Sequence, residues 1–148
     1  MSPIRGVWLF YARSFDVFGR SRRFEMLWAN VFFWGVCGTF FYFVIRYGLD
    51  GNAYDVENLT PAGETLFYGS IAFALISFIP MVTLHIRRFH DMGHSGWLVA
   101  LFACLNIIPP IGALGGIIQF FWTQFGSGTA GANKYGQDPR FTPGYEFQ

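Results

Sequence analysis

Three long stretches without a charged side chain constrain this chain more than any other feature. Residues 26–45, 65–84 and 95–133 contain no Asp, Glu, Lys or Arg. An apolar stretch of about 18 residues or more is typical of a membrane-spanning helix. Only 13% of all residues are charged, roughly half the share found in soluble domains. The sequence therefore indicates an all-α integral membrane protein and excludes a soluble enzyme domain.

We expect three main transmembrane helices. The first two spans, residues 26–45 and 65–84, have twenty residues each, which is about 30 Å of helix. The third apolar stretch, residues 97–125, is too long for one perpendicular span and too short for two. Pro109 and Pro110 leave two alternatives: one long crossing helix kinked at the prolines, or a re-entrant hairpin of two half-helices. We favour the kinked crossing, because the residues before the prolines reach only about 18 Å.

The remaining segments fit a single membrane domain over residues 1–148. Residues 1–25 mix arginines with aromatic side chains, as an amphipathic segment at the membrane interface does, and residues 126–148 form a turn-rich tail. Cytoplasmic loops are rich in Lys and Arg. The N-terminal segment has five such residues, the connector 85–96 has two and the loop 46–64 has one. We therefore expect the N-terminus and the connector in the cytoplasm.

Three short motifs follow one another along the chain. G-R-S-R-R at 19–23 precedes the first span, R-R-F-H-D-M-G-H-S-G-W at 87–97 begins the third apolar stretch, and G-T-A-G-A-N-K-Y-G-Q-D-P at 128–139 follows it. Together they resemble a bacterial inner-membrane family known as domain of unknown function 805. The resemblance implies a small multi-pass protein of the bacterial inner (plasma) membrane. It implies no activity, because the family is defined without one.

The second motif carries the densest set of polar side chains. We expect Arg88, His90 and Asp91 to form a hydrogen-bonded cluster with an arginine from the first motif, because an unpaired charge beside a membrane is costly. Ser95 is expected to cap the following helix. The alternative is that the arginines bind lipid headgroups or another anion. The full candidate set for a structural or headgroup-binding cluster is Arg20, Arg23, Arg87, Arg88, His90, Asp91 and Ser95.

The same region offers potential metal ligands. His85, His90, Asp91 and His94 lie close in sequence, and His90 with His94 would share one face of a helix. Gly93 argues against an undisturbed helix there, and zinc sites need tight, fixed ligand sets. We therefore expect no metal or other cofactor, and a juxtamembrane metal-binding protein stays as an alternative.

Polar residues in the third apolar stretch suggest another alternative. Asn106 lies one turn before Pro110, and Gln119 follows on the other side. Polar groups beside an interrupted backbone can line a polar path for an ion or substrate, which would make the chain a small oligomeric transporter or channel. Asn106 would otherwise satisfy a carbonyl group freed by proline. Gly112 and Gly116 form a G-x-x-x-G pattern, which allows close helix association and so predicts a homo-oligomer.

The sequence contains no recognisable catalytic set, since no nucleophile stands with a base and an oxyanion hole. We therefore do not expect an enzyme. The net charge of +1 also argues against a nucleic-acid partner, which a strongly basic surface would bind. The favoured hypothesis is a non-enzymatic scaffold or partner subunit. It would bind membrane lipids or another membrane protein through a cytoplasmic basic face.

Overall fold

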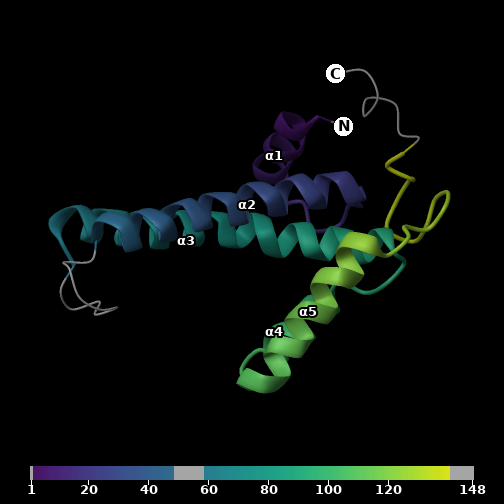
Figure 1. The fold of residues 1–148 in the computed structure, drawn as a ribbon. Helices are drawn as coiled ribbons and strands as arrows, with labels where there is room; N and C mark the ends of the chain where they lie inside the picture. The colour runs from purple at the N-terminus through teal and green to yellow at the C-terminus, as the bar shows by residue number, and fades with distance from the viewer. Residues whose placement is uncertain (1, 49–58, 141–148) are drawn as a thin grey trace. The chain divides into compact units, whose positions relative to one another are not determined.

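The computed structural model describes residues 2–48 and 59–140, which divide into two compact units (Figure 1). Unit 1 comprises residues 2–29 and 80–140, and unit 2 comprises residues 30–48 and 59–79. The regular elements of the described residues are helices, joined by turns and irregular segments, with an isolated antiparallel bridge between Asn133 and Gly136. The elements are α1 (Pro3–Ala12), α2 (Arg23–Phe43), a short π-helix η1 (Val44–Gly48), α3 (Pro61–Asp91), α4 (Trp97–Leu105) and α5 (Pro109–Phe125).

Two helices are long and apolar enough to cross a membrane. They are the 24-residue segment Arg23–Arg46 and the 31 residues of α3, with mean hydropathies of 1.5 and 1.9. At 1.5 Å per residue they measure about 36 and 46 Å, which exceeds the roughly 30 Å of a bilayer core. The expected spans 26–45 and 65–84 lie within these helices. Helix α3 also continues to Asp91, so most of the expected connector 85–96 is helical.

Gly93 sets the end of α3. Its φ is +79°, a left-handed conformation that glycine adopts without steric cost. The Gly93 N–H donates to the His90 carbonyl at 3.0 Å, and the His94 N–H donates to the Phe89 carbonyl at 2.9 Å. These two bonds form a Schellman motif, which satisfies the last carbonyl groups of the helix. Asp91 is thereby held in the final turn of α3.

Residues 97–125 form two helices, so the expected single kinked helix is wrong. In Figure 1, α4 and α5 lie side by side and the chain reverses between them. Ile108 precedes a proline and is extended, with φ −99° and ψ 104°, as steric clash with the proline ring requires. Proline loses no hydrogen bond in the first turn of a helix, whereas inside a helix it removes one, so Pro109 is well suited to begin α5. The nine residues of α4 and seventeen of α5 measure about 14 and 26 Å, so the alternative of two short helices describes this segment better.

The G-x-x-x-G pattern is used inside this hairpin. A Cβ atom on Gly112 would lie 2.6 Å from the Cα of Asn106, and one on Gly116 would lie 3.9 Å from the Oδ1 of the same residue. The neighbouring Gly115 faces Phe102 and Leu105 in α4. The small residues therefore allow α5 to approach the end of α4, and the homo-oligomer stays a prediction.

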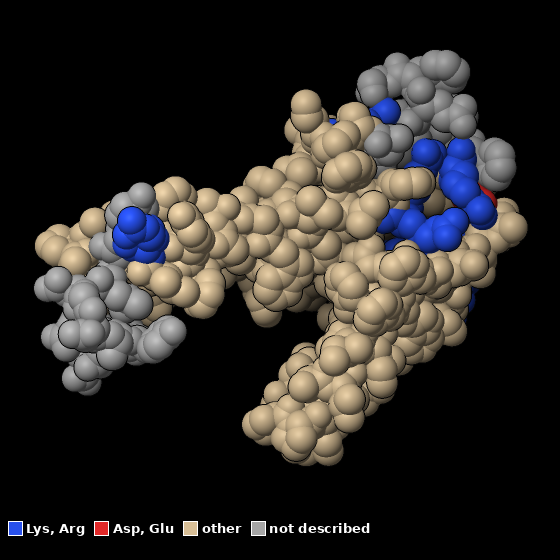
Figure 2. Space-filling view, viewed as in Figure 1, with Lys and Arg blue, Asp and Glu red and all other residues tan. Residues whose placement is uncertain are grey.

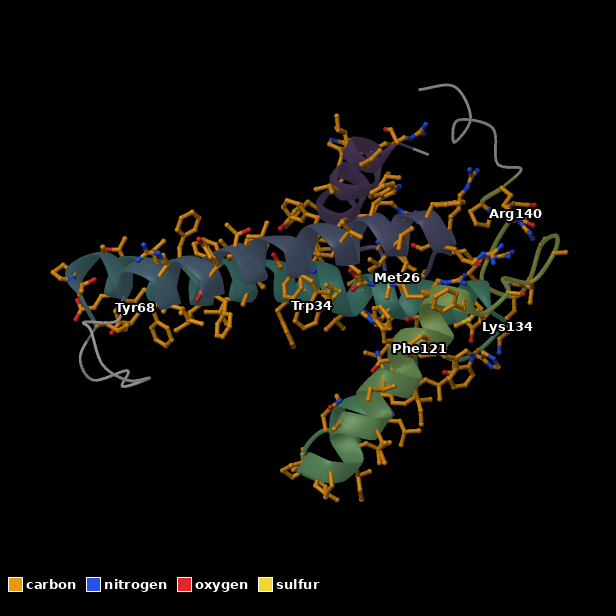
Figure 3. All side chains as sticks on the ribbon, in the orientation of Figure 1. Met26, Trp34, Tyr68, Phe121, Lys134 and Arg140 are labelled. Atoms are coloured by element: carbon orange, nitrogen blue, oxygen red, sulfur yellow. The ribbon has the colours of Figure 1, made fainter. Side chains whose placement is uncertain are left out.

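Aromatic contacts connect the helices of unit 2. The ring of Phe73 in α3 stacks on Phe33 of α2 at 5.7 Å and meets Phe32 edge-on at 6.0 Å. Most other large side chains of these segments point outward, as Trp34 and Tyr68 do with 63% and 66% of their surface exposed (Figure 3). Apolar side chains on the outside are what lipid-facing helices require.

Unit 1 has a small apolar core beneath α1. Phe10 packs with Met26, Ala29 and Leu84, all of them fully buried. A Cβ atom on Gly6 would lie 2.6 Å from the Cβ of Trp28, so α1 crosses α2 closely there. The opposite face of α1 exposes large apolar side chains, Ile4 and Trp8. The N-terminal segment is thus a helix with an apolar outer face, and its place at the membrane interface stays a prediction.

Candidate functional site

Asp91 lies between two buried arginines in unit 1. Its Oδ1 accepts a hydrogen bond from Arg20 Nε at 3.0 Å, and its Oδ2 accepts one from Arg88 Nη1 at 2.6 Å. The arginine side chains are at most 1% exposed and the aspartate side chain is 8% exposed. We call these three residues the aspartate cluster. Charge-assisted hydrogen bonds of this kind are about twice as strong as neutral ones.

Backbone carbonyl groups satisfy the other N–H groups of the two guanidiniums. Arg20 donates to the carbonyls of Thr129 at 2.6 Å and Gly131 at 2.7 Å. Arg88 donates to the Thr123 carbonyl at 2.7 Å and to the Gly126 carbonyl. A buried charge is tolerated only when it is paired and hydrogen-bonded. The aspartate cluster therefore binds the end of α3 to the end of α5 and to the tail.

The tail also packs on the backbone of α3. Thr129 donates its N–H and its hydroxyl to the Asp91 carbonyl, at 2.8 and 3.0 Å. Asn133 Nδ2 donates to the His90 carbonyl at 2.9 Å. A Cβ atom on Gly128 would lie 2.1 Å from Asp91 Oδ2, so this position has room for glycine alone. Residues 128–133 therefore cover the last turn of α3.

The imidazole ring of His90 forms part of the contact between α3 and the tail. The imidazole stacks on the phenol ring of Tyr135 at 3.8 Å with an interplanar angle of 7°, and the residue is buried. We expected His90 to act as a hydrogen-bonding group beside the arginine–aspartate pair. In the structure the ring hydrogen-bonds the backbone of Gly19 and also provides a flat surface on which the tail packs.

A second buried ion-pair group surrounds Glu25 in the first turn of α2. Arg87 Nη2 lies 3.2 Å from Glu25 Oε1, and Arg13 Nη1 lies 3.8 Å from Oε2. The Ser21 hydroxyl donates to Oε1 at 3.2 Å. The side chains of Arg87 and Glu25 are at most 1% exposed. This glutamate cluster joins α1, α2 and α3, and our sequence analysis missed it.

A third charged pair stabilises the tail itself. Arg140 Nη2 donates to Asp138 Oδ2 at 2.7 Å, and the Gly131 N–H donates to the same oxygen at 3.0 Å. The side-chain hydrogen bond from Arg140 lowers the pKa of Asp138 below its usual value, against the opposing effect of burial, and the Arg140 and Gly131 backbone N–H groups lower it further. Asp138 therefore stays ionised and keeps residues 131–140 folded as a loop.

The clusters join residues 19–23, 87–97 and 128–139, the three motifs of the sequence. A family described as a protein of unknown function, DUF805, matches residues 14–137. The chain belongs to this family. The match confirms the resemblance that the three motifs suggested, and it gives no activity.

Two relatives of this DUF805 chain are Escherichia coli proteins. Inner membrane protein YhaI of strain K12 is 42% identical over 79 residues, which cover 53% of this chain and 60% of YhaI. Inner membrane protein YhaH of the same strain is 38% identical over 71 residues, which cover 48% of this chain and 52% of YhaH. The chain thus spans between half and two thirds of the length of these relatives. No solved structure matches it significantly.

The DUF805 structure separates the predicted site residues into three groups. Arg20, Arg88 and Asp91 come together, with His90 beside them, whereas Arg87 belongs to the glutamate cluster. The guanidiniums of Arg20, Arg87 and Arg88 are buried and paired with carboxylates inside unit 1, so they are not available to a lipid headgroup. Figure 2 shows lysine and arginine side chains of unit 1 gathered beside the tail. Their exposed members have to provide any headgroup contact.

Arg23 and Ser95 lie outside both clusters. Arg23 is exposed, and within the described ranges 2–48 and 59–140 it forms no ion pair. Ser95 Oγ accepts the Trp97 N–H at 3.4 Å, but the residue at the N-cap of α4 is Gly96 and it makes no side-chain capping bond. The Ser95 hydroxyl therefore bonds an N–H group of the first turn of α4, one residue before the N-cap position.

The potential metal ligands are not brought together. Among the residues that the structure describes, no group of three or more His, Cys, Asp or Glu side chains could hold a metal ion. His85 Nδ1 hydrogen-bonds the Met81 carbonyl at 2.8 Å, and His94 meets Trp122 edge-on at 5.1 Å. Each histidine thus has a separate environment, and the geometry gives no support to the metal-binding alternative.

Asn106 lies at the end of α4 and Gln119 lies within α5, and a joint polar path stays a prediction. Asn106 is exposed at the turn of the α4–α5 hairpin, and its Nδ2 donates to the Phe102 carbonyl at 2.8 Å. Gln119 lies three residues beyond Gly116, where a Cβ atom would lie 3.9 Å from Asn106 Oδ1. The Asn106 side chain therefore completes the last turn of α4, and no mid-helix carbonyl freed by proline is involved.

Proposed function

We propose that this DUF805 chain is a multi-pass inner-membrane protein that acts as a non-enzymatic scaffold or partner subunit. In this proposal unit 1 lies at the cytoplasmic surface and binds anionic membrane lipid. The supporting observation is the charge of unit 1, whose described residues include nine Lys and Arg against four Asp and Glu. The excess of five positive charges is concentrated in one compact unit, although the whole chain has a net charge of only +1.

The orientation follows from this asymmetry. Lys and Arg close to membrane-spanning helices favour the cytoplasmic side, and that leaflet carries the anionic lipids. Two helices of membrane-spanning length and relatives named inner membrane proteins support the same location. The N-terminus belongs to unit 1 and is therefore cytoplasmic in this proposal.

The exposed cations are the groups that would meet the lipid. Arg23, Lys134 and Arg140 are exposed, and Figure 3 marks the last two on the tail. A Lys or Arg near an anionic membrane surface contributes about 1 kcal/mol. The buried arginines serve to fix these three positions, so the aspartate and glutamate clusters act as the framework of the binding surface.

Native mass spectrometry of the delipidated chain tests the proposal. The protein in detergent is offered equal amounts of phosphatidylglycerol and phosphatidylcholine with identical acyl chains. We expect more phosphatidylglycerol adducts, and we expect the excess to fall as salt rises, because exposed charges are screened. Replacing Arg23, Lys134 and Arg140 together by Gln should remove the excess. Equal adducts of the two lipids on the unsubstituted chain would contradict the proposal.

Orientation is tested separately with reporters fused at the N-terminus and at Gly51. The N-terminal reporter should score cytoplasmic, and the reporter in the loop between α2 and α3 should score on the other side. A cytoplasmic signal from Gly51 would contradict the orientation, whatever the lipid measurement gives.

A further inference from the structure

Unit 1 contains a crevice between the first turns of α2 and the last turns of α5. Its volume is about 320 Å³. Four of the six lining residues are apolar and two are polar, and none of them takes part in the aspartate or glutamate clusters. The lining residues are Arg23, Phe24 and Leu27 from α2, and Phe120, Gln124 and Phe125 from α5.

Arg23 gives this crevice a positive charge that no carboxylate of the described residues pairs with. The carboxylates of the aspartate and glutamate clusters already have arginine partners. Glu25 pairs with Arg87, and Asp91 pairs with Arg20 and Arg88. Arg23 itself forms no ion pair with any residue that the structure describes. A planar guanidinium with free N–H groups is suited to bind the oxygens of a phosphate.

Gln124 adds a buried hydrogen-bond donor to the same lining. The residue is 8% exposed, and its Nε2 has no hydrogen-bond partner in the described part of the chain. A buried polar group without a partner is costly, and native structures rarely leave one. An acceptor oxygen in the crevice would satisfy it.

The apolar walls indicate what kind of molecule carries that acceptor. Phe24 and Phe125 are still 58% and 69% exposed, so the crevice is open along its apolar side. Sites for small soluble ligands bury most of the ligand, which this crevice does not do. An amphiphile meets both requirements, because its headgroup sits at the cation while its chains continue along the outside of apolar helices.

We propose that this crevice binds one anionic phospholipid of the surrounding membrane. The Arg23 guanidinium pairs with the phosphate, Gln124 Nε2 donates to a phosphate or ester oxygen, and the phenylalanine rings contact the first part of the acyl chains. The inference rests on the lipid-binding function proposed above, and it assigns that function to one site formed by α2 and α5.

The test uses the delipidated full chain in detergent and measures the dissociation constant of the first phosphatidylglycerol by native mass spectrometry. Arg23→Gln should weaken this binding about tenfold, as loss of a charge-assisted hydrogen bond does. Arg5→Gln is the matched control, because it removes the same charge from α1 of unit 1, outside the crevice and outside the three cations of the proposed binding surface. It should change the constant by less than about twofold.

Two further variants test the crevice without removing a charge. Leu27→Trp fills the space between α2 and α5 and should weaken phosphatidylglycerol binding while Arg23 is kept. Gln124→Leu removes the buried donor and should weaken binding severalfold; it should not lower the unfolding temperature of the lipid-free chain, because the donor has no partner there.

The outcomes separate this inference from the general proposal. Weaker binding in Arg23→Gln, Leu27→Trp and Gln124→Leu, with Arg5→Gln unchanged, supports the site. Equal losses in Arg23→Gln and Arg5→Gln would overturn the crevice and leave a diffuse basic surface. No preference for phosphatidylglycerol in the unsubstituted chain would overturn both.

Discussion

The two compact units of this chain differ in which side chains they bury and in the contacts that join their helices. In unit 2, the described residues include one arginine and one glutamate, and its helices meet through phenylalanine rings while most apolar side chains face outward. Unit 1 instead buries Arg20, Arg87 and Arg88 with their carboxylate partners. Lipid tails are as apolar as leucine, so burial alone does not hold helices together in a membrane. Unit 1 shows how ion pairs specify one arrangement where apolar contact specifies little.

Loss of Asp91 should give the largest difference between the units. Asp91→Ala leaves two buried guanidiniums without their carboxylate, which costs about 3–5 kcal/mol of unfolding free energy. The matched change in unit 2 is Glu64→Ala, an exposed residue in the first turn of α3, where the cost should be at most about 1 kcal/mol. Chemical unfolding in detergent, followed by circular dichroism, measures both. Equal losses would show that the aspartate cluster is no more important than a surface charge.

A side chain at position 128 should separate the tail from α3. The contact of Gly128 with Asp91 Oδ2 leaves no room for a Cβ atom, so Gly128→Leu should cost about 1–3 kcal/mol. Hydrogen exchange of the Thr129 amide, which donates to the Asp91 carbonyl, should become faster. Ser127→Leu is the control, since Ser127 is exposed and its substitution should leave this amide protected.

Glycine-to-alanine changes in helices should have opposite signs in the two units. A Cβ atom on Gly38 in unit 2 meets nothing within 4 Å, so Gly38→Ala should stabilise α2 by up to about 1 kcal/mol. Gly6→Ala in unit 1 places its methyl group 2.6 Å from the Cβ of Trp28 and should destabilise the crossing of α1 and α2. Thermal unfolding of the two variants side by side tests the sign. Stabilisation by Gly6→Ala would contradict the close crossing.

Acidification should have the smallest effect, confined to the tail of unit 1. The Arg140 hydrogen bond lowers the pKa of Asp138 in the folded tail, so this stabilisation is present above the ordinary aspartate pKa of about 3.9 and is lost as the pH falls through the lower folded-state value. Exchange of the Gly131 amide, corrected for the intrinsic pH dependence, should therefore rise between about pH 4 and pH 2. In Asp138→Asn the amide should exchange faster at neutral pH and show no such step.

The sequence alone predicted the two long helices, because an uncharged apolar stretch of twenty residues is typical of a membrane-spanning helix. It was not sufficient for residues 97–125. Two adjacent prolines fit a kink inside a helix and the first turn of a new one equally well. The choice depends on whether Ile108 can be extended, and that is decided by the packing of Gly112 and Gly115 against α4.

The same limit applies to the charged residues. The cost of a lone charge beside a membrane was enough to predict that Asp91 pairs with an arginine of the first motif, and the structure places Arg20 there. The partner of Arg87 could not be predicted from the sequence, because adjacent residues on a helix point about 100° apart. Arg88 faces the tail while Arg87 faces Glu25, and only the placement of α1 and α2 around α3 determines which carboxylate each one meets.

The aspartate cluster has a consequence for the order of events during synthesis. Arg20 is made long before Thr129 and Gly131, whose carbonyl groups accept its hydrogen bonds. At about 5–20 residues per second, the guanidinium waits roughly 5–20 seconds for these partners. During that interval the apolar helices can already be inserted in the membrane while the aspartate cluster of unit 1 is still incomplete. A chain that stops before residue 129 would leave Arg20 without these carbonyl acceptors, so the burial of Arg20 depends on residues made more than a hundred positions later.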